Sequence, residues 1–162
     1  MENTKPKSKL YLDTSVISYL EQDDVPEKMR ITRNVWEQLK RGDYDIYLSN
    51  TVIFELNKCK DPKKRDLLMS HLEEIQYYLV DIVDDAEGLA HYLIERGFLK
   101  EKNLDDSKHI ATAMVYECDC IISWNFKHIV KYKTMNGIRE IALEQGRKNI
   151  LIYSPESFEE EL

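Results

Sequence analysis

The sequence of 162 residues has few glycines and no long apolar run. Its five glycines are scattered, which excludes a glycine-rich phosphate loop and a dinucleotide-binding fingerprint. No apolar segment approaches the ~20 residues that a membrane span requires. Residues 1–8 are polar and lack the apolar core of a signal peptide. We therefore expect a cytoplasmic protein without membrane association.

Cysteine is also scarce, with only Cys59, Cys118 and Cys120. An odd number without framework spacing indicates reduced thiols rather than a disulfide scaffold. The pair Cys118 and Cys120 resembles half of a zinc site, but no second Cys or His pair at the spacing of a zinc finger completes it. Half-buried free thiols are the favoured interpretation.

The composition suits one globular unit, because 43% of the residues are hydrophobic and the charged residues are spread through the chain. We expect residues 1–8 to form a flexible N-terminal extension and residues 9–162 to form a single domain. The net charge of −7 does not by itself indicate nucleic-acid binding.

Two stretches nevertheless carry more Lys and Arg than acids, residues 58–66 and residues 124–149. Two explanations are open. In the first, both stretches are solvated helix faces. In the second, they attract a polyanion toward an acidic site.

Strand-like and helix-like segments alternate along the chain. Strands are expected at residues 9–13, 44–49, 77–83, 120–123 and 149–153. Helices are expected at residues 14–21, 26–41, 50–56, 62–74, 84–97, 104–117 and 126–145, and after Ser154. We expect Asp24 to cap the second helix and a possible break near Gly137 in the seventh. This alternation predicts an α/β protein, a three-layer α/β/α sandwich with a central parallel sheet.

Three acids lie on otherwise apolar segments far apart in the sequence. Asp13 ends the first strand, Glu55 follows the second strand, and Asp106 opens the helix that precedes the fourth strand. A buried carboxylate is costly unless it binds something, and parallel sheets place their sites beyond the carboxyl ends of the strands. The sequence therefore predicts a divalent-metal site. Oxygen ligands favour Mg²⁺ or Mn²⁺, which activate water and stabilise charge on a phosphoryl group.

Each acid also has a simpler explanation. Asp13 is a favourable helix N-cap, and Glu55 fits a solvent-facing position. Asp105 and Asp106 stand at the start of the helix expected at 104–117, where acids are favoured by the exposed N–H groups. His109 lies four residues after Asp105 and could pair with it on a metal, contact a phosphate or cap a neighbour. Next to Asp13, Thr14 and Ser15 offer hydroxyls and N–H groups that could orient a carboxylate or contact a phosphate.

Four short motifs occur in a fixed order: Leu-Asp-Thr-Ser-Val-Ile at 12–17, Ser-Asn-Thr-Val-Ile-Phe-Glu-Leu at 49–56, Asp-Ser-Lys-His-Ile-Ala-Thr-Ala at 106–113, and Cys-Ile-Ile-Ser-Trp-Asn-Phe-Lys-His-Ile at 120–129. With them the chain resembles, over nearly its whole length, a PIN domain, the metal-dependent ribonuclease fold of many VapC-type toxins. The resemblance implies metal ligands at Asp13, Glu55 and Asp106, and it makes these acids and Asn125 the catalytic residues. Many relatives carry an aspartate where Asn125 stands; asparagine can still coordinate through its carbonyl oxygen or hold a water, but it adds no negative charge.

The resemblance further implies that Thr14, Ser15, Ser123, Lys127 and His128 contact the substrate. It implies a metal-dependent endoribonuclease that hydrolyses RNA phosphodiester bonds, the toxin of a type II toxin–antitoxin pair, with a cognate antitoxin and a homodimeric assembly. The alternative is a catalytically weak PIN-like module that binds RNA or a protein partner without cleavage. The net acidity and Asn125 favour that alternative.

Overall fold

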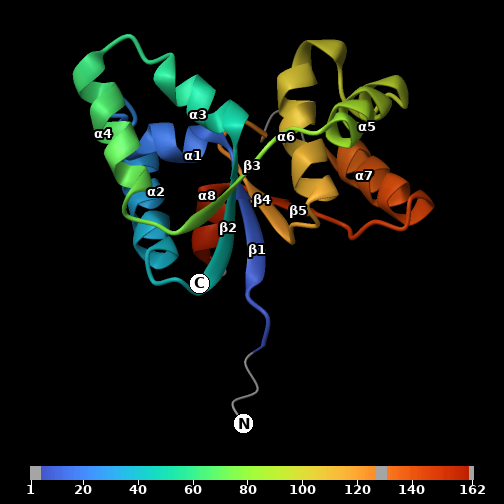
Figure 1. Ribbon diagram of the computed structural model, residues 1–162, viewed down its shortest axis with the longest axis horizontal. Coiled ribbons are helices and arrows are strands. Elements are labelled where there is room, and N and C mark those ends of the chain that lie inside the picture. The colour runs from blue at the N-terminus through green and yellow to red at the C-terminus, as the bar shows by residue number, and fades with distance from the viewer. Residues whose placement is uncertain (1–4, 127–130, 161–162) are drawn as a thin grey trace.

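A central five-stranded sheet organises the molecule in the computed structural model, which describes residues 5–126 and 131–160 (Figure 1). All strand pairs are parallel and the order is β3-β2-β1-β4-β5. The strands are β1 (Ser8–Leu12), β2 (Tyr44–Ser49), β3 (Tyr77–Val80), β4 (Cys120–Ile122) and β5 (Leu151–Tyr153). The parallel sheet predicted from the alternation of segments is confirmed.

Helices cover both faces of this sheet, which gives the predicted three layers (Figure 1). One face carries α1 (Thr14–Ser18), α2 (Pro26–Leu39), α3 (Asn50–Asn57), α4 (Pro62–Leu72) and α8 (Pro155–Glu160). The other face carries α5 (Asp84–Glu95), α6 (Leu104–Val115) and α7 (Tyr132–Glu144). Two 3-10 turns, Tyr19–Glu21 and Glu101–Asn103, lead out of α1 and into α6.

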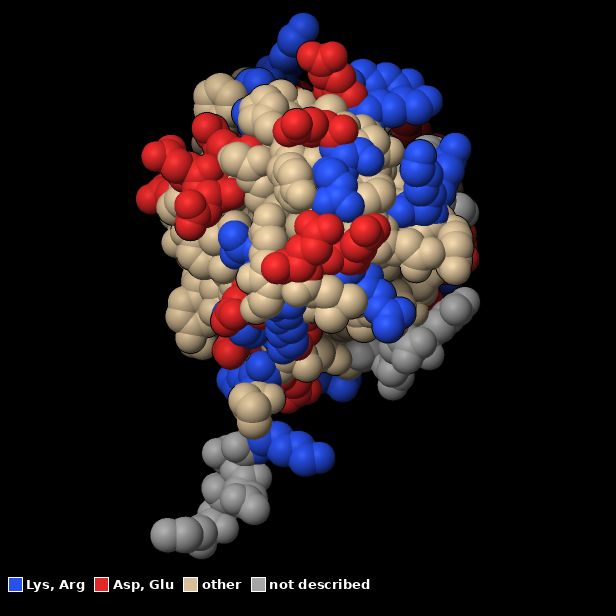
Figure 2. All heavy atoms as spheres, turned by 90° about the vertical axis from the view of Figure 1, so that its right-hand side faces the viewer, with Lys and Arg blue, Asp and Glu red and all other residues tan. Residues whose placement is uncertain are grey.

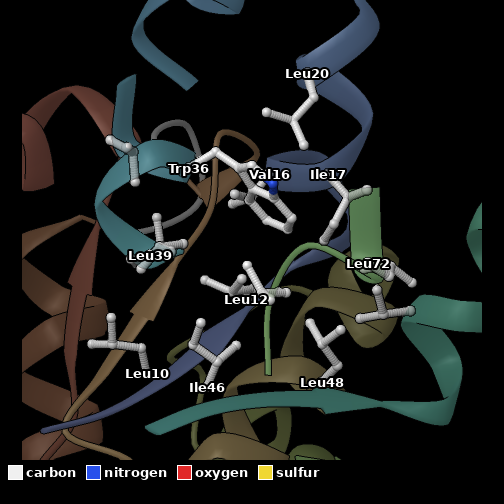
Figure 3. Packing of buried hydrophobic residues seen from close by; sticks show 14 of the residues in the cluster. Leu10, Leu12, Val16, Ile17, Leu20, Trp36, Leu39, Ile46, Leu48 and Leu72 are labelled. Atoms are coloured by element: carbon white, nitrogen blue, oxygen red, sulfur yellow. The ribbon is translucent and has the colours of Figure 1, made fainter. Parts of the chain in front are cut away.

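The central strands are apolar because both of their faces are buried. Leu10 and Leu12 of β1 pack toward α1 and α2, whereas Tyr11 between them points into the core under α6. Figure 3 shows the first of these cores, in which side chains of the sheet meet Trp36 and Leu39 of α2. Each fully buried Leu or Ile side chain contributes roughly 1.5–3 kcal/mol to folding, so the two cores fix the sheet between its helices.

Several helix ends follow the sequence signals. Asp61 accepts hydrogen bonds from the backbone N–H groups of Lys63 and Lys64 and so caps α4. Gly97 follows the C-cap residue of α5 and adopts a positive φ of 80°, the left-handed conformation in which many helices end at a glycine.

Other predicted boundaries were wrong. Asp24 does not cap α2; its carboxylate accepts a hydrogen bond from the Gln22 amide, and Val25 occupies the cap position. Strand β3 ends at Val80, and the first helix passes into a 3-10 turn after Ser18.

Helix α7 continues through Gly137 without the break considered from the sequence. The glycine is needed there for close packing, because a Cβ at this position would lie 2.2 Å from the ring of Phe98. Residues 127–130, which were expected to begin this helix, lie outside the described part of the chain.

The carboxyl ends of three strands bring functional groups to one edge. Asp13 follows β1, α3 follows β2 directly, and Ser123 follows β4. The backbone N–H of Asp13 donates to the carbonyl of Ile122 at 3.1 Å, which ties the ends of β1 and β4 together. Among the helices of the described ranges, none has the length and apolar character needed to cross a membrane.

Candidate active site

Asp13 is the most buried of the three predicted acids, with only 2% of its surface exposed. Its Oδ2 atom accepts hydrogen bonds from the hydroxyls of Ser15 at 2.8 Å and Ser123 at 2.7 Å. The Ser15 backbone N–H, at 3.4 Å, makes Asp13 the N-cap of α1 as well. Hydrogen bonds to a charged group contribute roughly 1.5–3 kcal/mol each, which offsets the cost of burying this carboxylate.

The segment after β4 is held against Asp13 by the same serines. Ser15 Oγ accepts from the backbone N–H of Trp124 at 2.9 Å, and Ser123 Oγ accepts from the backbone N–H of Asn125 at 3.0 Å. The side-chain amide of Asn125 is exposed and lies 3.4 Å from Asp13 Oδ2. The polar position predicted in this segment therefore faces the Asp13 carboxylate.

His109 of α6 lies between two of the acids and is 2% exposed. Its Nε2 atom is 3.2 Å from Glu55 Oε1 and 3.6 Å from Asp13 Oδ1. Its Nδ1 atom is 2.6 Å from the hydroxyl of Tyr11, which in turn lies 2.8 Å from Ser49 Oγ. Ionised carboxylates only accept hydrogen bonds, so Nε2 carries a hydrogen, and in the neutral imidazole Nδ1 accepts from Tyr11.

The charges of this cluster favour an ion pair between His109 and Glu55. Burial lowers the pKa of His109, but the hydrogen bond to Glu55 and the neighbouring carboxylate charges outweigh burial and raise that pKa above its usual value. Burial raises the pKa of Glu55, but the interaction with His109, together with those of Thr14 and Lys58, outweighs burial and leaves that pKa lowered. The imidazolium thus neutralises part of the acidic charge.

Asp106 experiences the opposite effect. It is half-buried in the first turn of α6, and burial together with repulsion from Asp13 raises its pKa from 3.8 to about 6, despite the attraction of His109. Its neighbour Asp105 is exposed. Of the two acids that open this helix, Asp106 is therefore the one that is half-buried and coupled to Asp13 and Glu55.

The side chains that the sequence grouped as metal ligands do not all meet at one point. Within residues 5–126 and 131–160, no three side chains of His, Cys, Asp or Glu converge closely enough to hold a metal ion. Asp13 and Glu55 instead both contact His109. The predicted substrate contacts Lys127 and His128 lie outside the described residues.

The donor chemistry nevertheless suits a hard cation. Asp13, Glu55 and Asp106 offer only oxygen, and their mutual repulsion is the kind that a bound cation relieves. The Thr14 hydroxyl is buried beside them; it contributes to lowering the pKa of Glu55 without making a hydrogen bond of ordinary geometry to a described residue. An oxygen donor in this position fits a cation or its water shell.

Sequence reasoning missed Tyr11 and Ser49 and assigned His109 to other partners. Tyr11 is fully buried, and a buried tyrosine hydroxyl needs a hydrogen-bond partner. The available signal was its place between Leu10 and Leu12, which directs the ring to the opposite face of the sheet from its neighbours. Its partners come from β2 and α6, and no spacing in the sequence identifies them.

No protein-family model matches the chain, and no curated protein sequence matches it. Several solved structures are similar to it. The VapBC2 structure from Rickettsia felis, bound to a DNA fragment from its promoter, is 14% identical with a TM-score of 0.56, covering 90% of this chain and 98% of that one. VapC20 of Mycobacterium tuberculosis, a toxin that cleaves the sarcin–ricin loop, is 14% identical with a TM-score of 0.57, covering 73% and 91%. A toxin–antitoxin complex from Klebsiella pneumoniae is 18% identical with a TM-score of 0.51, covering 73% and 88%.

At these identities the comparisons establish the fold. The chain has the PIN-like α/β fold of the VapC toxins, as its sequence motifs predicted. The fold alone does not assign an activity, a metal or a partner to this chain.

Proposed function

We propose that this protein is a metal-dependent endoribonuclease that hydrolyses RNA phosphodiester bonds in the cytoplasm. One observation carries the proposal: Asp13 and Glu55, from segments 42 positions apart in the printed sequence, contact the same His109 nitrogen, and Asp106 is electrostatically coupled to both. Like charges gathered on a buried edge are costly for a structural protein and useful for one that binds a cation. The PIN-like fold supports the same reaction class.

In this proposal Asp13, Glu55 and Asp106 hold the ion, with Asn125 as the polar fourth position. A bound Mg²⁺ or Mn²⁺ supplies an activated water and neutralises charge on the phosphate. Ser15 and Ser123 fix the Asp13 carboxylate through hydrogen bonds of 2.8 and 2.7 Å.

The remaining polar groups serve the substrate in this proposal. The buried Thr14 hydroxyl lies at the same edge and suits a contact to a phosphate oxygen. Ser15 and Ser123, which were also predicted to contact the substrate, act through Asp13 instead, because each hydroxyl donates its single hydrogen to that carboxylate. Lys127 and His128 follow in the chain and, we propose, contact the RNA backbone.

RNA cleavage by the purified protein tests the proposal. Structured and single-stranded RNAs are incubated with Mn²⁺, with Mg²⁺ or with EDTA. We expect metal-dependent cleavage that Asp13→Asn abolishes and that Asp105→Asn retains, because Asp105 is exposed outside the cluster. Equal cleavage by the wild type and by Asp13→Asn would refute the role of this site.

A PIN-like module that binds RNA or protein without cleaving is the second candidate. The absence of a convergent ligand group within the described ranges favours it, as does asparagine at position 125. RNA binding without cleavage in either metal, by the wild type and Asp13→Asn alike, would support this candidate over the nuclease.

We further propose that the protein is a toxin with a cognate antitoxin and that it forms a homodimer. The support is the fold, since the similar structures from Rickettsia felis and Klebsiella pneumoniae are of toxin–antitoxin systems. Co-purification with the product of the adjacent gene, followed by light scattering to determine the stoichiometry, tests both statements. A monomer that binds no product of the adjacent gene would contradict them.

A further inference from the structure

A second concave site, which we call the lysine pocket, lies between the α5–α6 connection and the start of α7. Its volume is about 350 Å³, within the size range of small-ligand sites. The lining comes from two chain segments and consists of Gly97, Phe98, Leu99, Lys100, Lys102, Asn103, Lys131, Lys133 and Thr134. Four of these residues are lysines and none is acidic.

The two walls of the pocket are fastened together. The Phe98 ring lies directly on α7 at Gly137, where a Cβ would come within 2.2 Å of it. The Thr134 hydroxyl donates a hydrogen bond of 2.8 Å to the Phe98 carbonyl. The backbone N–H of Asn103 donates to the Lys100 carbonyl at 2.8 Å and closes a turn in the other wall. The lysines therefore project from a built frame rather than from two independent loops.

Acids of the described residues do not pair with the lysines of the pocket. Within the described ranges, Lys100, Lys102, Lys131 and Lys133 form no ion pair with an acid. Lys131 immediately precedes α7 and Lys133 lies in its first turn, so both ammonium groups stand at the end of the helix where the helix dipole is positive. Figure 2 shows Lys and Arg side chains toward the upper right of the face formed by α5, α6 and α7, with Asp and Glu side chains between and beside them.

The other basic stretch, residues 58–66, likewise forms no ion pair with an acid of the described residues, but it contains Asp61 and Asp66 and its side chains have other hydrogen-bond partners. Asp61 caps α4 with its carboxylate, the Lys64 ammonium donates to Gln22, and the Arg65 guanidinium donates to the Cys59 carbonyl. Its acids and its hydrogen bonds occupy the helix start. That stretch serves as a solvated helix surface and supplies a matched control.

The lysine pocket also lies close in the chain to the candidate active site. Lys102 belongs to the 3-10 turn that leads directly into α6, and Asp106 stands in the first turn of that helix. A strand of RNA whose scissile phosphate reaches Asp106 would have neighbouring phosphates within reach of this turn.

We propose that the lysine pocket binds backbone phosphates of single-stranded RNA beside the cleavage site. This inference rests on the proposed nuclease function and specifies which surface holds the substrate. Four ammonium groups recognise phosphates without reading the base. The pocket therefore contributes affinity and register, and it leaves base selection to other parts of the site.

RNA binding measured over a series of KCl concentrations tests the pocket. The measurement uses a short single-stranded RNA in EDTA, where metal-dependent cleavage does not interfere. Lys100→Ala/Lys131→Ala is compared with Lys60→Ala/Lys63→Ala, which removes the same charge from exposed lysines of the other basic stretch. Each lost phosphate contact on a single strand lowers the slope of log affinity against log salt by about 0.7, so we expect the pocket variant to lose about 1.4 and the control variant to lose little.

The outcomes distinguish the proposed phosphate-binding role of the pocket from the proposed nuclease activity. If the pocket variant keeps the wild-type slope of log affinity against log salt, or if the control variant loses as much of that slope, the proposed phosphate-binding role of the pocket is wrong. A reduced slope in the pocket variant supports it, even if the wild type fails to cleave RNA in Mn²⁺ and the nuclease proposal is lost. Absence of any RNA binding by the wild type overturns both.

Discussion

Replacing Asp106 by asparagine isolates the cost of gathering like charges at the carboxyl edge of the sheet. The Asp106 pKa rises from 3.8 to about 6, chiefly through burial and through repulsion from Asp13. At about 1.4 kcal/mol per pKa unit the full shift corresponds to roughly 3 kcal/mol. The side chain is only half-buried, and solvent screening reduces this to about 1–2 kcal/mol. We therefore expect Asp106→Asn to be more stable than the wild type by that amount at pH 7.5 in EDTA.

The pH dependence follows from the direction of the shift. Between about pH 4 and pH 6 the native carboxyl holds a proton that the unfolded chain has released, so wild-type stability falls as pH rises through this range. Above pH 6 the free-energy cost of keeping Asp106 ionised in the folded protein is constant, and below pH 4 this cost disappears. The gain from Asp106→Asn should therefore be present at pH 7.5 and lost at pH 4.

Urea unfolding of the metal-free proteins measures the effect, with Asp105→Asn as the control for loss of an acid from the first turn of α6. Adding Mn²⁺ should reverse the order, because an ion bound by the native wild type stabilises it by mass action and the variant loses a ligand. If Asp106→Asn is no more stable than Asp105→Asn at pH 7.5, the proposed repulsion within the cluster is wrong.

Three further substitutions probe the site and its frame. Tyr11→Phe removes the buried hydroxyl that His109 Nδ1 contacts at 2.6 Å; we expect a loss of about 1–3 kcal/mol in urea unfolding, and unchanged stability would contradict the network. Gly137→Ala forces the Phe98 ring to move; overpacking of about 1–3 kcal/mol should exceed the ~1 kcal/mol gain in helix propensity, so a rise in Tm would refute the close contact. Asn125→Asp adds a carboxylate to the cluster, and calorimetry should show tighter Mn²⁺ binding with lower metal-free stability; unchanged binding would remove this position from the metal site.

Much of the architecture was accessible from the sequence, because it depends on local chemistry. The apolar runs ending at Leu12 and Ile122, and the alternation at residues 44–49, are typical of strands buried in a parallel sheet, and helical segments between them require crossovers. Asp61 and Gly97 marked their helix ends, since capping depends on residues a few positions apart. The predicted cap at Asp24 was wrong: the Asp24 carboxylate accepts a hydrogen bond from the side-chain amide of Gln22, and Val25 occupies the cap position.

The placement of the acids was also predictable in outline. Parallel strands present their carboxyl ends at one edge, so residues that follow β1, β2 and β4 had to approach one another. This rule covers Asp13 and Glu55, whose oxygens suit a hard cation. Asp106 precedes β4 in the chain, and the sequence grouped it with them through its helix-start motif and the resemblance to a PIN domain.

The contacts that hold those acids are visible only in the tertiary structure. The imidazole of His109 stands between Asp13 and Glu55, and its other nitrogen contacts the Tyr11 hydroxyl, which in turn contacts Ser49. The lysine pocket likewise depends on a ring from the α5–α6 connection resting on a glycine of α7. Such contacts join segments many residues apart, and their energies arise from packing and burial that exist only once the chain has folded.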